Sequence, residues 1–193
     1  MSFIGEIPTG SATRLFLWQV EENPDHPKYA KIASTFRGKS LKRRTEELGG
    51  TLLLEHLGIK NDISYLENGK PVVDDGYISI SHTEDLVGVV FSTSPVGLDI
   101  QRPTPKLFNI KEKFCNEREL KMWGESLDQL TLIWSAKEAV FKLFGENLAF
   151  AEEIDVHFGD KDNEFYAKVR GGEESFTLHH LMFKEKKVVW VST

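Results

Sequence analysis

The chain has 193 residues, of which 40% are hydrophobic and 28% charged, as expected of a soluble globular protein with a sizeable core. Its 24 basic and 30 acidic side chains give a formal net charge of −6, which argues against general nucleic-acid binding. No apolar stretch approaches the roughly 20 residues that cross a bilayer, and the first residues lack the pattern of a secretory signal. Cys115 is the only cysteine, so an internal disulfide is excluded. We therefore expect a cytoplasmic protein with no membrane or nucleic-acid partner.

The first part of the chain is predicted to form a strand, two helical stretches and three short strands. The segment 13–20 is predicted to form a strand, and a turn follows at 23–25. In the second helical stretch leucines recur at helical spacing, and Gly58 is expected to end it. The expected helices cover 27–36 and 40–57, and the expected short strands cover 62–66, 77–82 and 86–92.

The second part repeats this order of elements. A strand at 96–101 precedes the helices, and a run of strands follows them. The expected helices cover 107–114, 116–123 and 127–145, and the strands cover 153–158, 163–170, 174–182 and 187–192. Because strands and helices come in blocks, the pattern predicts an α+β fold that duplicates a unit of one strand, helices and antiparallel strands. We place the N-terminal repeat at 1–95 and the C-terminal repeat at 96–193.

Basic side chains gather in the segment 36–44, which contains no acid. The five are Arg37, Lys39, Lys42, Arg43 and Arg44. A local basic cluster in an acidic protein indicates an anionic ligand bound at one place. The alternative is a solvated helix start, which charge alone favours.

Two short motifs before residue 95 could bind an anion. Gly69, Lys70 and Pro71 predict a turn that offers an ammonium group. Ser81 and His82 come at the end of an apolar strand, and both side chains can donate hydrogen bonds to a phosphate. A single histidine at a strand end is more often structural.

The strand at 96–101 carries an acid between apolar neighbours. Side chains alternate along a strand, so Gly97, Asp99 and Gln101 share one face. With a glycine beside it, Asp99 is expected to present an open carboxylate suited to a hard cation such as Mg²⁺. The alternative is the polar outer face of an edge strand, which this stretch alone favours.

A helical stripe is predicted in the stretch 127–145. Trp134, Glu138 and Lys142 recur at i, i+4 spacing and so lie on one side of the helix. The neighbouring positions are strongly apolar, which makes a solvated surface pair a poor explanation. A core helix with one salt bridge remains the alternative.

Taken in order, these motifs resemble those of the phosphopantetheinyl transferase superfamily, in its two-repeat, single-chain type that activates peptide synthetases. The family pattern is Gly-Lys-Pro, a Ser-His pair, Gly-apolar-Asp-apolar, and then Trp-(Ser/Thr)-x-Lys-Glu-(Ala/Ser)-x-x-Lys. All four motifs occur here in that order, at 69–71, 81–82, 97–100 and 134–142. The first and last forty residues carry little of this signal.

The resemblance implies an enzyme that moves the 4′-phosphopantetheine group of coenzyme A onto a serine of an acyl or peptidyl carrier protein and releases adenosine 3′,5′-bisphosphate. It implies a Mg²⁺ ion held by Asp99 and Glu138, with Gln101 as a third candidate ligand. Glu138 would be the catalytic base, and Asp99 and Lys142 would complete the catalytic set. It further implies a monomer with its active site in the cleft between the two repeats. The residues that would bind coenzyme A are Arg37, Arg43, Arg44, Lys70, Pro71, Ser81 and His82.

Two positions depart from the family pattern. Gln101 replaces a second carboxylate that many relatives carry, so fewer anions would hold the metal. Thr51 stands where relatives often carry a phosphate-binding arginine, a task that would pass to one of the three arginines above. These departures leave open a degenerate relative that binds coenzyme A without transferring its arm. An interaction module that docks acidic proteins is a further alternative.

Overall fold

A computed structural model describes residues 3–9, 12–36, 38–145, 148–159, 165–170, 172 and 174–193. The chain forms two compact units, Met1–Thr93 and Ser94–Thr193. Among the described residues, every helix is too short or too polar to span a bilayer.

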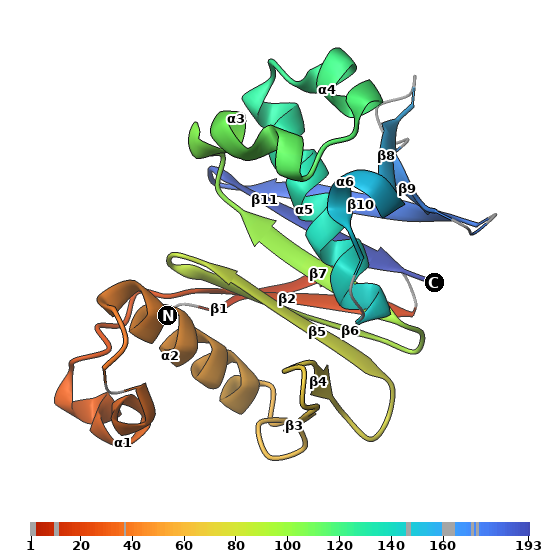
Figure 1. The fold of residues 1–193 in the computed structure, drawn as a ribbon. Coiled ribbons are helices and arrows are strands. Elements are labelled where there is room, and N and C mark those ends of the chain that lie inside the picture. The colour runs from red at the N-terminus through yellow and green to blue at the C-terminus, as the bar shows by residue number, and fades with distance from the viewer. Residues whose placement is uncertain are drawn as a thin grey trace. The chain divides into compact units, whose positions relative to one another are not determined.

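The first unit contains an antiparallel sheet in the order β1-β2-β6-β5, with the long helix α2 packed against β2, β5 and β6 (Figure 1). Short helices precede α2, and a small hairpin, β3-β4, follows it. The strands are β1 (Phe3–Pro8), β2 (Thr13–Gln19), β3 (Ser64–Tyr65), β4 (Pro71–Val72), β5 (Tyr77–Thr83) and β6 (Leu86–Ser92). The helices are η1 (Pro27–Tyr29), α1 (Ala30–Ala33), η2 (Ser34–Phe36) and α2 (Leu41–His56).

Local sequence explains where α2 begins and how it packs. The hydroxyl of Ser40 accepts a hydrogen bond from the backbone N–H of Arg43, which caps the first turn. Leu53 and Leu54 are buried in the core that α2 forms with the sheet. After the helix, Gly58 has a φ of 74°, a conformation that glycine adopts at little cost. The predicted end of the helix at Gly58 is therefore confirmed.

The second unit contains a five-stranded antiparallel sheet in the order β7-β11-β10-β9-β8. The helix α5 crosses this sheet, and shorter helices flank it (Figure 1). The strands are β7 (Val96–Gln101), β8 (Ile154–Phe158), β9 (Phe165–Val169), β10 (Ser175–Phe183) and β11 (Lys186–Ser192). The helices are α3 (Lys106–Ile110), η3 (Lys111–Lys113), α4 (Glu117–Trp123), α5 (Leu127–Phe144) and α6 (Phe150–Glu153).

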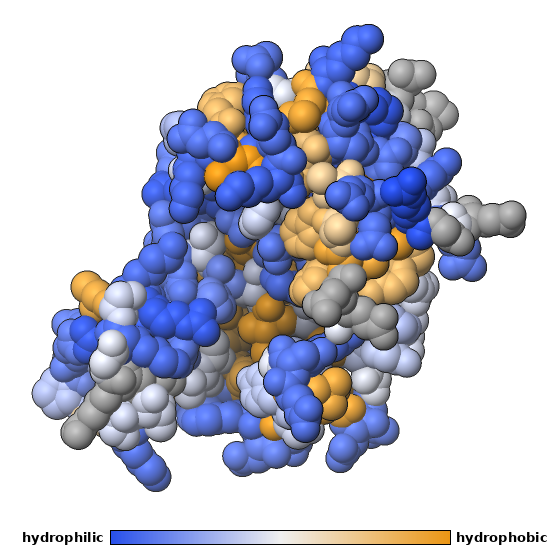
Figure 2. All heavy atoms as spheres, viewed as in Figure 1, coloured by the Kyte–Doolittle hydropathy of each residue, from blue (hydrophilic) through white to orange (hydrophobic). Residues whose placement is uncertain are grey.

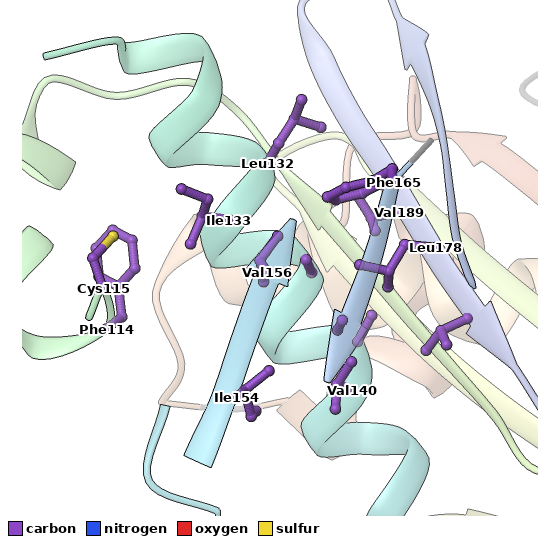
Figure 3. Close-up of a cluster of buried hydrophobic side chains, with 14 of the residues drawn as sticks. Phe114, Cys115, Leu132, Ile133, Val140, Ile154, Val156, Phe165, Leu178 and Val189 are labelled. Atoms are coloured by element: carbon purple, nitrogen blue, oxygen red, sulfur yellow. The ribbon is translucent and has the colours of Figure 1, made fainter. Parts of the chain in front are cut away.

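The core of the second unit lies between α5 and its sheet. Ile133 and Val140 of α5 belong to one buried cluster with Val156, Leu178 and Val189, which come from three strands (Figure 3). The helix ends at Gly145, whose φ of 72° is a left-handed conformation that glycine adopts at little cost. Most of α5 is apolar and packed in this core. Two of its few charged residues, Glu138 and Lys142, belong to the candidate site.

The two units share a connectivity. In each, the strand before the long helix pairs with the last strand, and the last strand pairs with the one before it: β2-β6-β5 and β7-β11-β10. All of these pairings are antiparallel. The predicted α+β class is confirmed, and the matching strand order supports a duplicated unit.

Several elements differ from the sequence-based expectation. The strand β1 was not predicted, because Gly5 and Pro8 break the alternation and its pairing with β2 is irregular near Phe3 and Gly5. The helical stretch expected at 27–36 is divided into two 3₁₀ turns around one short α-helix. The strand β4 (Pro71–Val72) and the short helix α6 (Phe150–Glu153) were also not predicted, and β4 includes Pro71 of the Gly-Lys-Pro motif.

Candidate functional site

The candidate catalytic residues of the second unit lie where α5 crosses β7. Gly97 and Asp99 pair with Val191 and Val189 of β11, and those two valines belong to the core beneath α5. A Cβ on Gly97 would lie only 1.9 Å from the carbonyl oxygen of Ala139 in α5. The glycine is therefore required for helix and strand to come this close.

This arrangement corrects the expected surroundings of Asp99. The carboxylate was expected to be open, or to lie on the solvated outer face of an edge strand. β7 is indeed an edge strand, but α5 covers the face that carries Asp99, which is only 3% exposed. A carboxylate this buried keeps its charge only if cations or hydrogen-bond donors surround it.

Lys142 supplies such a cation. Its Nζ lies 2.9 Å from Oδ1 of Asp99 and also donates to the carbonyl oxygen of Leu98 at 2.9 Å. Glu138, one turn earlier on α5, shares these surroundings. Burial raises the pKa of Glu138, the nearby Asp99 carboxylate raises it further, and Lys142 opposes both effects. Two carboxylates and one ammonium group from distant parts of the sequence thus converge.

The third member of the predicted stripe has a different role. Trp134 packs edge-on against Phe114, with ring centroids 5.1 Å apart, and lies 5.7 Å from the ring of Phe150. These contacts make Trp134 part of the core of the unit. The stripe therefore contributes Glu138 and Lys142 to the charged site, whereas Trp134 holds the helix in place.

The charged site has the donor set that Mg²⁺ prefers. Asp99 and Glu138 offer two carboxylates, and Gln101 follows on the same strand face as Asp99. Among the described residues, no group of three or more His, Cys, Asp or Glu side chains is placed to hold a metal. Two protein carboxylates suit Mg²⁺ when phosphate oxygens and waters complete its shell. The residues therefore fit a metal that is shared with a phosphorylated ligand.

The first unit contains a pocket of about 470 Å³ between α2, the β3-β4 hairpin and β5. One part of its wall is apolar and the other is charged. The apolar part comes from Leu54, Tyr65, Pro71 and Ile80, and the charged part from Arg43, Glu46, Glu47 and His82. Figure 2 shows hydrophilic side chains gathered over the start of α2, which supplies most of these charges.

The structure separates Arg43 from Arg44, two of the three arginines predicted to meet a phosphate. Arg43 lines the pocket, and its Nη1 lies 3.1 Å from Nε2 of His82. Arg44, the next residue along α2, forms an ion pair with Asp25 instead. Arg37 lies outside the described residues. Of the two that can be placed, Arg43 is therefore the one beside His82.

Of the other described residues predicted to bind coenzyme A, Pro71 lines the pocket, whereas Lys70 and Ser81 do not. Pro71 lines the pocket together with Gly69, whose φ of 81° makes the turn before it. Ser81 is 5% exposed and lies on the opposite face of β5 from His82, because side chains alternate along a strand.

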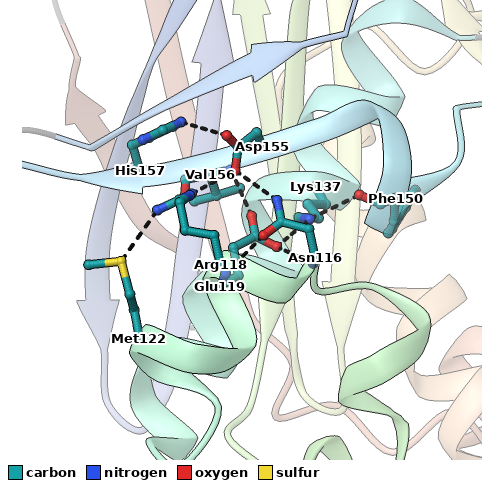
Figure 4. A network of polar contacts seen from close by, with 9 residues as sticks. All are labelled: Asn116, Arg118, Glu119, Met122, Lys137, Phe150, Asp155, Val156 and His157. Atoms are coloured by element: carbon teal, nitrogen blue, oxygen red, sulfur yellow. Dashed lines mark hydrogen bonds and ion pairs between the residues drawn. The ribbon is translucent and has the colours of Figure 1, made fainter.

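Sequence reasoning missed a buried ion pair behind α5. Lys137 and Glu119 are fully buried, and Nζ of Lys137 lies 2.7 Å from Oε2 of Glu119 and 2.9 Å from the carbonyl oxygen of Phe150 (Figure 4). Glu119 also accepts hydrogen bonds from the backbone N–H groups of Val156 and Asn116. Asn116 and Glu119 form the capping box of α4. Their spacing of three residues is the sequence signal that could have drawn attention to Glu119.

Comparison with known proteins identifies the family. The model of the 4′-phosphopantetheinyl transferase superfamily matches residues 95–191, which is half of the chain and spans nearly all of the second unit. This chain belongs to that superfamily.

Individual relatives carry the same family name. The chain is 34% identical over 106 residues to the 4′-phosphopantetheinyl transferase gsp of Aneurinibacillus migulanus, a match that covers 50% of this chain and 44% of the relative. It is 30% identical over 123 residues to 4′-phosphopantetheinyl transferase HetI of a Nostoc species, covering 56% and 51%. It is 31% identical over 100 residues to 4′-phosphopantetheinyl transferase Sfp of Bacillus subtilis, covering 47% and 45%. The matched regions thus span about half the length of each of these curated relatives.

Proposed function

We propose that this protein transfers the 4′-phosphopantetheine group of coenzyme A to a serine of an acyl or peptidyl carrier protein in a Mg²⁺-dependent reaction. The observation that carries the proposal is the convergence of Asp99, Glu138 and Lys142 at one partly buried place where α5 crosses β7. Membership of the superfamily and the names of the relatives support the same reaction. The other product would be adenosine 3′,5′-bisphosphate.

The chemistry requires positioned charge. When the serine oxygen attacks the β-phosphorus of coenzyme A, negative charge grows on the phosphate oxygens of the leaving group. Asp99 and Glu138 would hold Mg²⁺, with Gln101 as a further oxygen donor, and the ion would supply positive charge to those oxygens when bound. Lys142 would neutralise part of the same charge.

Glu138 is proposed as the base that accepts the proton of the serine hydroxyl, directly or through a water. Its raised pKa supports this role, because a carboxylate with a higher proton affinity is a stronger base. Asp99 accepts a hydrogen bond from Lys142 and would therefore place its negative charge at a fixed position beside that ammonium group.

The pocket of the first unit is proposed to bind the adenosine end of coenzyme A. Its apolar wall, with Tyr65 and Pro71, suits a flat base, and Arg43 and His82 suit a phosphate. Lys70 and Ser81 remain proposed phosphate ligands, although neither lines this pocket. Arg44 is the weaker candidate because Asp25 already pairs with it. We further propose a cytoplasmic monomer.

One observation favours a second candidate function. Gln101 leaves only two carboxylates near the proposed metal, so a protein that binds coenzyme A without transferring its arm is the alternative. Mass spectrometry of an apo carrier protein, incubated with this protein, coenzyme A and Mg²⁺, separates the two functions. The enzyme adds the phosphopantetheine mass to the carrier, whereas a binder leaves the carrier unchanged and still binds coenzyme A in a calorimetric titration.

Variants test the residue roles in the same assay. Asp99→Ala and Glu138→Ala should each abolish transfer while circular dichroism shows the fold intact. Glu125→Ala is the matched control, because it removes an acid whose side chain is 94% exposed in the same unit. Near-normal turnover of both Asp99→Ala and Glu138→Ala would refute the assignment.

A further inference from the structure

The pocket of the first unit holds an acid behind its basic side chains. Glu46 is 6% exposed, whereas the side chains of Arg43 and His82 are 49% and 30% exposed. The two basic groups can therefore meet a ligand from solvent, and the carboxylate lies on their inner side. An acid at this position is unexpected in a pocket that is to bind a phosphate.

The contacts of Glu46 show what it does in the empty pocket. Its Oε2 lies 3.3 Å from Nδ1 of His82 and 3.7 Å from Nη1 of Arg43, and its Oε1 lies 3.9 Å from Nζ of Lys42. The backbone N–H of Glu84 donates to Oε1 at 3.2 Å, which anchors the carboxylate. Glu46 thus faces three basic side chains at ion-pair distances, from a position largely shielded from solvent.

We propose that Glu46 is a built-in counter-anion that competes with the ligand's phosphate for Arg43 and His82, and so limits the affinity of the pocket for anionic nucleotides. This inference rests on the proposed function, because it assumes that the pocket binds the phosphorylated adenosine end of coenzyme A. A phosphate that reaches Arg43 must share its positive charge with Glu46 at 3.7 Å and with Glu47, whose Oε1 accepts a hydrogen bond from Nε of Arg43 at 2.8 Å. Repulsion between buried like charges is weakly screened, so the cost grows with the charge of the ligand.

The consequence is a weaker hold on every anionic adenosine ligand. Adenosine 3′,5′-bisphosphate and coenzyme A share the 3′-phosphate, so Glu46 would lower the affinity of both. The affinity of a neutral ligand such as adenosine would not depend on the charge of Glu46 in this way. A purely structural Glu46 would instead affect the stability of the unit, with no dependence on ligand charge.

Calorimetric titration of the full chain tests the proposal with adenosine 3′,5′-bisphosphate and adenosine as probes. Glu46→Gln removes the charge and retains an oxygen that can accept the Glu84 N–H. We expect it to bind the bisphosphate about tenfold more tightly than the parent, with adenosine affinity unchanged. Glu55→Gln is the matched control, because Glu55 is an exposed acid on the same helix that pairs with Lys60.

The outcomes are distinct. If the parent binds the bisphosphate and Glu46→Gln binds it equally or more weakly, Glu46 is not a competing anion and only this inference fails. If the parent binds neither the bisphosphate nor coenzyme A, the proposed function fails as well. Should Glu46→Gln not fold, Glu46→Ala is measured in the same way. In an Arg43→Gln background the gain from Glu46→Gln should shrink, because the shared cation is gone.

Discussion

Lys142 on α5 donates a hydrogen bond to Asp99 on β7, with Nζ 2.9 Å from Oδ1, although the two residues are 43 positions apart. The ammonium group therefore already occupies one side of the carboxylate that is proposed to hold Mg²⁺. A cation in contact with Asp99 competes with a metal for the same negative charge.

This competition predicts opposite effects of Lys142→Gln on binding and on catalysis. In the absence of coenzyme A, the variant should bind Mg²⁺ a few times more tightly, because the competing ammonium group is gone. Transfer should fall by about 100-fold or more, because Lys142 no longer neutralises the leaving group. Calorimetric Mg²⁺ titration and the carrier-protein assay measure the two effects. A parallel loss of both would show that Lys142 mainly supports the metal site.

The close packing of α5 on β7 predicts that Gly97→Ala is destabilising. A new Cβ would meet the carbonyl oxygen of Ala139 at 1.9 Å, and the backbone cannot yield without separating helix and strand. We expect a loss of about 1–3 kcal/mol in the free energy of unfolding, measured by urea denaturation.

Gly50→Ala is the control for that experiment. Gly50 lies inside α2, and nothing is within 4 Å of the position of its Cβ. Its replacement should raise stability by about 0.5–1 kcal/mol, because alanine favours a helix. Equal effects of the two substitutions would contradict the packing argument.

The raised pKa of Glu138 predicts that the difference in stability between the parent and Glu138→Gln depends on pH. The folded protein holds this proton more tightly than the unfolded chain does, so ionised Glu138 opposes folding. The penalty is full above the raised pKa and absent below the unfolded value of 4.5. In the absence of Mg²⁺, Glu138→Gln should therefore be more stable than the parent at neutral pH, and the gap should close as the pH falls toward 4.5. Urea denaturation across this range tests it, and a gap that is constant with pH would refute it.

The buried pair of Lys137 and Glu119 predicts a non-additive result. Burial lowers the pKa of Lys137, although the Glu119 carboxylate opposes this effect. Lys137→Met should cost about 3–5 kcal/mol, because Glu119 would keep a buried charge without its main partner. Adding Glu119→Leu should recover part of that loss. A double-mutant cycle from urea denaturation measures the coupling, and purely additive losses would show that the two side chains act independently.

Cys115 is predicted to be unreactive in the folded protein. Burial, and next the Glu119 carboxylate, raise the pKa of its thiol to about 12, so it remains protonated at neutral pH. A thiol-specific disulfide reagent should label Cys115 only after urea unfolds the chain. Rapid labelling under native conditions would show that this region opens.

The sequence by itself determined most of the elements and the identity of the motif residues. Leucine spacing and a final glycine defined α2, and alternation defined the strands that carry His82 and Asp99. These features are local, because periodicity and capping depend on residues within a few positions of one another. The order of the motifs was enough to indicate the superfamily.

Only the tertiary structure decided which of these residues meet. It places Arg43 beside His82 and Arg44 beside Asp25, a difference that two adjacent basic residues do not reveal in sequence. It buries Asp99 under α5, and it places Glu46 inside the pocket. The physical reason is that burial and charge pairing depend on the faces that pack together, and packing joins residues far apart along the chain.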